Sequence, residues 1–367
     1  MIAPGLEGVV AAETAIARVD GLAGTAIVRG YSLVDLARTS AYEDVALLLL
    51  DGDLPAAPAS EAALRPLPGE LRAAPGPDAG EAMVAVLAQI EPASTRALAP
   101  EERARAVLAR VPSAIAVAFG TSIDPEATYA RRALEALGAT RQDDAACRAL
   151  ETLLVLESEH GFSASTFAAR VVASSGAGPG PALAAAAATL LGERHGGATA
   201  LARDLLVEAL SYGDDLGAHV RAWRTSKRRL PGFGHRVYRV ADPRVPPLVD
   251  AIRSLAAERA PRPPDTHRAP LGGARLLDVA ERLDDEVRRA AGARPLHANI
   301  DLYGAVLLDA LGVPAPRFSA AFALGVAAGW LAHWIEQLAT QTLIRPESAY
   351  VGPPARPVPV RARVAPT

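Results

Sequence analysis

The chain has 367 residues, of which half are hydrophobic, and a formal net charge of −3. This length is enough for a large core and two domains, and the balanced charge, without a long run of one sign, argues against nucleic acid or an acidic membrane as a partner. Cys147 is the only cysteine, which excludes an intrachain disulfide and a cysteine metal cluster.

The N-terminus has no basic segment followed by an apolar run, and apolar windows such as residues 181–191 are shorter than a bilayer-spanning helix. We therefore expect a cytoplasmic protein without a membrane segment. The seven histidines show no spacing typical of metal ligands. We expect no metal.

Residues 8–30 alternate weakly between apolar and polar side chains around Gly21 and Gly24, which predicts a short β-hairpin. Beyond residue 30 apolar residues recur at helical spacing. The helices predicted on this basis are 32–37, 42–51, 80–90, 100–119, 147–159, 165–174, 181–191, 198–210, 215–224, 246–259, 275–291, 301–312 and 318–340, with further helix starts at Asp124-Pro125 and at Asp143-Asp144. The predicted class is all-α, followed by a proline-rich tail that is either an extended arm or disordered.

The stretch from residue 191 to 199 places His195 between two predicted helices, and Gly196 and Gly197 let the chain turn from one into the other. The positive end of the second helix dipole disfavours an imidazolium. We therefore predict a neutral His195 that donates a hydrogen bond to an enolate or oxyanion. An exposed histidine in an ordinary helix–helix turn is the alternative that this stretch alone leaves open.

Three further stretches carry chemistry-bearing side chains. Residues 231–244 place His235 in a glycine-bounded loop ahead of Arg244, residues 299–304 put Asp301 in the first turn of a helix, and residues 157–170 place His160 at a helix–turn junction. Taken singly, each has an ordinary reading: Asp301 as a helix N-terminal residue, Asp242-Pro243 as a turn, and His160 as a partly buried polar group.

Taken together, in this order, these stretches resemble the citrate synthase family. The blocks that carry the resemblance are His-Gly-Gly-Ala at 195–198, Gly-Phe-Gly-His-Arg-Val-Tyr at 232–238 with Asp-Pro-Arg at 242–244, Asn-Ile-Asp-Leu-Tyr at 299–303, Gly-Trp-Leu-Ala-His at 329–333 and Arg-Pro at 345–346. The resemblance extends over nearly the whole chain and implies a two-domain helical fold with a short N-terminal β-hairpin.

The resemblance implies an acyltransferase that forms a carbon–carbon bond between acetyl-CoA and oxaloacetate. Asp301 matches the family's base, which removes a methyl proton from acetyl-CoA, and His195 matches the residue that donates to the thioester oxygen. His235 matches the residue that polarises the ketone of oxaloacetate. Hydrolysis of citryl-CoA would then release citrate and CoA.

Substrate recognition follows from the same resemblance. Arg244, His160 and Arg345 match residues that bind oxaloacetate, and Arg345 would come from the partner subunit of a homodimer. The backbone of Leu230, Pro231, Gly232, Phe233 and Gly234 would contact CoA. No cofactor is implied beyond this CoA substrate.

The resemblance also implies a division of the chain. Residues 1–195 and 301–367 would form a discontinuous large helical domain, and residues 196–300 a small helical domain that closes over the site and excludes water.

One position departs from the family pattern in a way that bears on the acceptor. Val326 stands where the family usually has an arginine for an oxaloacetate carboxylate, and Arg317, nine residues earlier, falls on nearly the opposite helix face. Three interpretations stay open: an ordinary citrate or 2-methylcitrate synthase with a compensated acceptor site; a condensing enzyme or lyase for a different 2-oxo acid; and a non-catalytic regulator that binds CoA or a metabolite.

Overall fold

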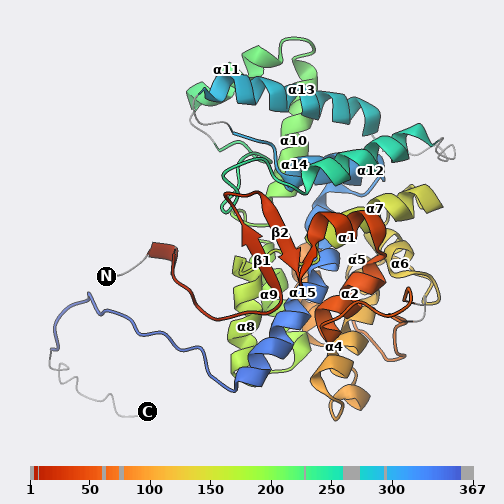
Figure 1. Cartoon of the computed structure of the whole chain (residues 1–367), viewed down its shortest axis with the longest axis vertical. Coiled ribbons are helices and arrows are strands. Elements are labelled where there is room, and N and C mark those ends of the chain that lie inside the picture. The colour runs from red at the N-terminus through yellow and green to blue at the C-terminus, as the bar shows by residue number, and fades with distance from the viewer. Residues whose placement is uncertain are drawn as a thin grey trace, which may run out of the picture.

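The structure is a computed structural model that describes residues 4–6, 8–59, 63–73, 78–226, 229–258, 273–292 and 296–356. It is mostly helical with one small antiparallel sheet near the N-terminus (Figure 1), which confirms the predicted class. The last part of the proline-rich tail, residues 357–367, lies outside the described residues.

The strands are β1 (Ala17–Asp20), β2 (Thr25–Val28) and β3 (Tyr31–Ser32). The helices are α1 (Leu33–Thr39), α2 (Tyr42–Asp51), α3 (Ala79–Ala88), α4 (Pro100–Ala109), α5 (Val111–Phe119), α6 (Tyr129–Leu137), α7 (Asp144–Glu157), α8 (Ala164–Ser174), α9 (Pro179–Leu190), α10 (Ala198–Ser211), α11 (Leu216–Ser226), α12 (Val245–Ala257), α13 (Gly273–Ala291), α14 (Ile300–Ala310) and α15 (Phe318–Thr340).

The predicted hairpin is β1 and β2, which pair antiparallel with Val19 opposite Ala26, and β3 adds a third, two-residue strand that the sequence pattern did not indicate. The carboxylate of Asp20 closes the turn, since it accepts hydrogen bonds from the backbone of Leu22 at 3.0 Å and Ala23 at 2.9 Å. The hairpin therefore has a rigid tip.

Several predicted helix bounds were wrong, and the helix predicted over residues 100–119 is two helices, α4 and α5. Helix α6 begins at Tyr129 rather than at Asp124-Pro125, because the side chain of Thr128 accepts from the backbone N–H of Arg131 and caps the first turn. Helix α9 begins at Pro179 rather than near residue 181. A proline fits there because the first helical residues have no intrahelical partner for their N–H groups.

Helix α15 is the buried centre of the molecule and packs against α7, α8 and α9. Gly325 and Gly329 lie four residues apart on the face toward α7, where a Cβ would lie 2.9 Å from the carbonyl oxygen of Leu154 and 2.4 Å from that of Ser158. Only glycine permits this approach. The packing fixes the segment that leads into His160.

The same helix corrects the expectation that every apolar window is too short to span a bilayer. Residues Ala315–Thr340 have the length and mean hydropathy of a membrane span, but 89% of the most apolar window is buried inside the protein. A helix buried on all sides has this composition in the core of a soluble protein.

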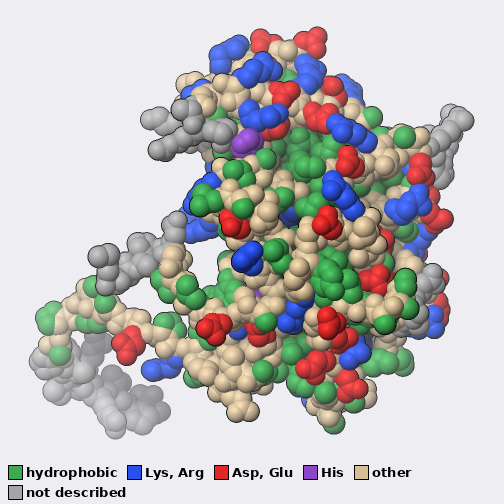
Figure 2. All heavy atoms as spheres, viewed as in Figure 1, with side chains coloured by type: hydrophobic (Ala, Val, Ile, Leu, Met, Phe, Trp, Pro, Cys, Tyr) green, Lys and Arg blue, Asp and Glu red, His purple; other side chains and the backbone are tan. Residues whose placement is uncertain are grey.

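Helices α10, α11, α12 and α13 lie together in the upper part of Figure 1, and α14 packs against α10, α12 and α13. Helix α12 also packs against α7, which connects this group to the rest of the chain. The division at residues 195 and 300 stays a prediction. On the face seen in Figure 2, basic and acidic side chains are intermingled.

Candidate active site

Backbone pairing joins the glycine-rich loop to the start of α14. The backbone N–H of Asn299 donates to the carbonyl of Gly232 at 2.9 Å, and its side-chain amide donates to that of Gly234 at 2.7 Å. Gly232 has φ +78°, and a Cβ there would lie 2.8 Å from the Cβ of Leu302. This pairing brings the loop of His235 beside the helix that carries Asp301.

Asp301 lies in the first turn of α14, where its backbone N–H donates to the side chain of Asn299 at 3.0 Å. Its carboxylate accepts a hydrogen bond from the hydroxyl of Thr199 on α10 at 2.7 Å. Burial raises the pKa of Asp301, against the opposing effect of Thr199. A desolvated carboxylate with a raised pKa is a stronger base than one in water.

His195 forms a hydrogen bond through Nε2 to the hydroxyl of Ser165 at 2.9 Å, and the indole N–H of Trp330 donates to the same hydroxyl at 3.2 Å. Burial lowers the pKa of His195, so the ring is neutral at pH 7. Helix α9 ends at Leu190, before the glycines, and His195 precedes Gly197, the N-cap of α10, by two residues. The effect of the α10 dipole on His195 stays a prediction.

The ring orientation of His235 is fixed by the protein backbone. Its Nδ1 accepts hydrogen bonds from the N–H groups of Val237 at 3.0 Å and Tyr238 at 3.1 Å. The proton of the neutral ring is therefore on Nε2. Burial, followed by the nearby charge of Arg244, lowers the pKa of His235 to about 4.

His160 lies in the same cluster. Its Nε2 is 3.0 Å from the hydroxyl of Tyr238, and its ring packs edge-on against those of His235 and Tyr238, with centroids 5.1 and 5.3 Å apart. Burial, with the positive charge of Arg244, lowers the pKa of His160 well below its usual value. Both histidines are neutral hydrogen-bonding groups at pH 7.

Arg244 is buried and bonded to two carboxylates. Its Nε and Nη2 donate to the two oxygens of Asp242 at 3.0 and 2.9 Å, and its Nη1 donates to Glu157 at 2.9 Å. Burial alone would raise the pKa of Asp242, but Arg244 lowers it to about 2. Asp242 thus does more than form a turn: it orients Arg244 and accepts from the backbone N–H of Ile300 at 3.3 Å.

Sequence reasoning missed three polar residues of this site: Glu157, Ser165 and Tyr238. A signal existed for Glu157, because it directly follows the buried apolar run of residues 153–156 and precedes His160 by three positions. A carboxylate that ends an apolar helix beside a candidate site residue is rarely buried without a partner. Tyr238 and Ser165 gave no comparable signal, since both residue types fit a loop or a helix start.

Three other residues that the sequence singles out lie outside the cluster of His160, His235 and Arg244. Arg345 is exposed, on the segment after α15 that runs away from the body of the molecule (Figure 1). Val326 is 9% exposed on α15. Arg317 donates to the carbonyls of Leu137 at 3.0 Å and Phe119 at 3.3 Å, which end α6 and α5. These hydrogen bonds hold the guanidinium of Arg317 at the ends of α5 and α6, away from the candidate site.

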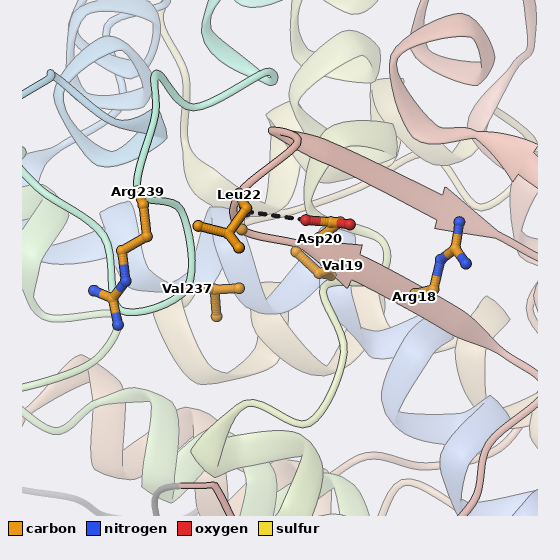
Figure 3. Close-up of a pocket in the computed structure, with 7 residues that line it drawn as sticks. Arg18, Val19, Asp20, Leu22, Val237 and Arg239 are labelled. Carbon is orange, nitrogen blue, oxygen red and sulfur yellow. Dashed lines mark hydrogen bonds between the residues drawn. The ribbon is translucent and has the colours of Figure 1, made fainter.

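A hollow of about 450 Å³ lies where the tip of the hairpin meets the loop that follows His235 (Figure 3). Its lining residues are Arg18, Val19, Asp20, Gly21, Leu22, Val237 and Arg239. The N–H of Arg239 donates to the carbonyl of Gly21 at 2.8 Å, and a Cβ on Gly21 would lie 2.1 Å from the carbonyl oxygen of Val237. The hairpin therefore braces the loop that positions His235.

Among the residues that the structure describes, no group of three histidine, cysteine or acidic side chains could hold a metal ion.

The family model described as citrate synthase, C-terminal domain, matches residues 5–347. The chain belongs to the citrate synthase family. It is 34% identical to a citrate synthase of Acidithiobacillus ferridurans over 380 residues, covering 95% of each chain. It is 32% identical to a 2-methylcitrate synthase of Mycobacterium tuberculosis over 381 residues, covering 98% of this chain and 92% of the relative.

Solved structures of the family superpose over almost the whole chain. Citrate synthase from Thermotoga maritima matches with a TM-score of 0.77 at 28% identity, covering 98% of both chains. A Thermoplasma acidophilum citrate synthase in ternary complex with carboxymethyl coenzyme A and oxaloacetate matches with a TM-score of 0.76 at 27% identity, covering 98% of both chains. The citrate synthase fold predicted from the sequence is confirmed.

Proposed function

We propose that this protein condenses acetyl-CoA with oxaloacetate to give citrate and CoA, as a homodimer in the cytoplasm. The observation that carries the proposal is the pairing of Gly232 and Gly234 with Asn299, which joins the loop that carries the neutral His235 to the start of the helix that carries the base candidate Asp301. The relatives named citrate synthase support the reaction. The relatives named 2-methylcitrate synthase make propionyl-CoA a close variant of the acyl donor.

In the first step Asp301 removes a proton from the methyl group of acetyl-CoA. The methyl proton is weakly acidic, so the step needs both a carboxylate of raised pKa and a donor to the developing enolate. His195 is that donor. Because Ser165 can donate its hydroxyl proton to Nε2, the proton of the neutral His195 ring is then on Nδ1, free for the thioester oxygen.

In the second step the enolate carbon attacks the ketone carbon of oxaloacetate. His235 donates its Nε2–H to the ketone oxygen and stabilises the charge that develops there. His160, Arg244 and the partner subunit's Arg345 bind the oxaloacetate carboxylates. Hydrolysis of the thioester of citryl-CoA then releases CoA and makes the reaction favourable.

The unit of residues 196–300 closes over the site and keeps water out until citryl-CoA forms. Backbone groups of Leu230 to Gly234 contact CoA. The CoA-binding role is supported by the close packing of the loop on α14, which Gly232 permits and which holds this backbone in one position.

The test of this mechanism is release of CoA from acetyl-CoA and oxaloacetate, followed with a thiol reagent. Asp301→Asn should lower kcat by about 10²- to 10⁴-fold, the usual contribution of a positioned general base. Asp309→Asn is a matched control on the same helix, because Asp309 is buried and paired with Arg203 outside the site. It should keep kcat within a few-fold.

Because each active site would use the partner subunit's Arg345, the activity of a mixture of two variants gives a second test. Arg345→Ala should also lose most activity, and a refolded equal mixture of Asp301→Asn and Arg345→Ala should recover about a quarter of wild-type activity. Half of the dimers are then mixed, and each has one site with both residues intact. No recovery, with mixed dimers present, would contradict a shared Arg345.

A second candidate is a condensing enzyme for a 2-oxo acid with one carboxylate. The observation in its favour is Val326, a buried apolar residue at the position where the sequence resemblance implies an arginine.

A further inference from the structure

Glu157 occupies the edge of Arg244 on which an acceptor carboxylate would bind. A guanidinium offers two edges for a bidentate contact, one formed by Nε and Nη2 and the other by Nη1 and Nη2. Asp242 takes the first with contacts of 3.0 and 2.9 Å, and Glu157 contacts Nη1 at 2.9 Å. The second edge is the one left for a substrate.

The surroundings of this pair are rich in negative charge. Among the described residues, the charged or titratable groups that face Glu157 besides Arg244 are Asp242, Asp301 and the neutral Tyr238. The side chains of Glu157 and Arg244 are 13% and 4% exposed, so water screens these charges little. A dicarboxylate acceptor would bring two more negative charges to a site where three carboxylates already face one guanidinium.

The neighbouring wall of the site supplies no compensating cation. Helix α15 packs directly on Glu157 at Gly325, where a Cβ would lie 3.0 Å from the Cβ of Glu157. The next residue of α15 is the apolar Val326. Among the described residues that face Glu157, Arg244 is therefore the positive group for which it and the acceptor compete.

From this geometry we propose that Glu157 controls the access of the acceptor to Arg244, so that oxaloacetate binds together with a proton taken up by Glu157. When Glu157 is ionised, its carboxylate stays bound to the guanidinium of Arg244. When Glu157 is protonated, it binds this edge less strongly and the acceptor carboxylate takes its place. Glu157 is a positioning residue that acts through Arg244, and this inference rests on the proposed function.

Burial, together with the charges of Asp301 and Asp242, raises the pKa of Glu157 to about 8 against the opposing charge of Arg244. The negative acceptor raises this pKa again in the complex. Because the pKa is higher in the complex than in the free enzyme, protons are taken up above pH 8 and the acceptor binds more weakly as the pH rises.

The experiment measures oxaloacetate binding by calorimetry in buffers of different ionisation enthalpy, at pH 7 and pH 9. The wild type should take up close to one proton per site at pH 9 and much less than one proton per site at pH 7. Its KM for oxaloacetate should rise up to tenfold per pH unit above pH 8, the slope of one coupled proton, whereas its KM for acetyl-CoA should stay constant.

Glu157→Gln keeps the size of the side chain but cannot ionise. It should bind oxaloacetate without proton uptake at pH 9, with a KM that is constant between pH 7 and pH 9. Glu151→Gln is the matched control: Glu151 is a partly buried carboxyl on α7 with a raised pKa that contacts the backbone of Tyr42 and not Arg244. Glu151→Gln should keep the wild-type proton uptake at pH 9 and the wild-type dependence of KM for oxaloacetate on pH.

A wild type that binds oxaloacetate without proton uptake at pH 9, or a Glu157→Gln variant that keeps the wild-type slope, would overturn this inference and leave the proposed function intact. A wild type that neither binds oxaloacetate nor releases CoA with it would overturn both.

Discussion

Each of the three candidate histidines has one ring nitrogen engaged by a group of the protein. Ser165 contacts His195, backbone amides contact His235, and Tyr238 contacts His160. The backbone N–H groups fix the tautomer of His235, and each of the three contacts leaves one ring nitrogen for the substrate. Burial lowers the pKa of all three rings, so they act by donating or accepting hydrogen bonds rather than through charge.

The contact between His195 and Ser165 makes a prediction at this scale. Ser165→Ala should lower kcat about fivefold, since a lost hydrogen bond corresponds to about 1 kcal/mol. It should also lower the free energy of unfolding by about 1–3 kcal/mol, because the indole N–H of Trp330 loses its buried partner. Steady-state kinetics and denaturant titration measure the two effects.

Ser175→Ala is the control, because its hydroxyl is exposed and donates to the carbonyl of Val172 near the end of α8. It should leave kcat unchanged. A Ser165→Ala variant with the kcat of the wild type would show that this hydrogen bond does not orient His195 for the reaction.

At the scale of elements, the N-terminal hairpin acts as a brace for the loop of His235. Its turn lies against Val237 and Arg239 (Figure 3). Nδ1 of His235 accepts from the backbone N–H of that same Val237. The position of the imidazole therefore depends on an element that is more than 200 residues away in the sequence.

Gly21→Ala tests this brace. The added Cβ would lie 2.1 Å from the carbonyl oxygen of Val237, a clash that the backbone must relieve by moving. We expect a loss of about 1–3 kcal/mol in the free energy of unfolding and a lower kcat as His235 moves. Leu22→Ala is the control, since Leu22 is 79% exposed at the same turn. If Gly21→Ala and Leu22→Ala have the same kcat, the hairpin does not position His235.

The elements themselves were largely predictable from the sequence. The bounds of α15 were predicted without error, because a long run of apolar and small residues with helical spacing has one plausible structure. The start of α6 was missed because a cap at Thr128 and a turn at Asp124-Pro125 look alike locally. The bond between Arg244 and Glu157 spans 87 residues, and no local pattern reports such a contact.

At the scale of the whole molecule, the C-terminal segment is the feature that a single chain leaves unexplained. It leaves α15 as an extended arm, and Leu343, Tyr350 and Val351 on it are 57%, 78% and 93% exposed (Figure 1). Large apolar side chains clustered on an extended arm are typical of a segment that packs on another chain. The homodimer that we propose would cover them and bring Arg345 to the partner's site.

The most direct test of the proposed activity is CoA release from acetyl-CoA with oxaloacetate, glyoxylate or pyruvate as acceptor, measured for the wild type beside Val326→Arg. The proposal predicts efficient turnover with oxaloacetate, and no gain in the variant, because an arginine at this buried position of α15 must be desolvated and overpacks the helix contact. Turnover near zero with oxaloacetate that the arginine restores would contradict it and identify a different 2-oxo acid as the acceptor.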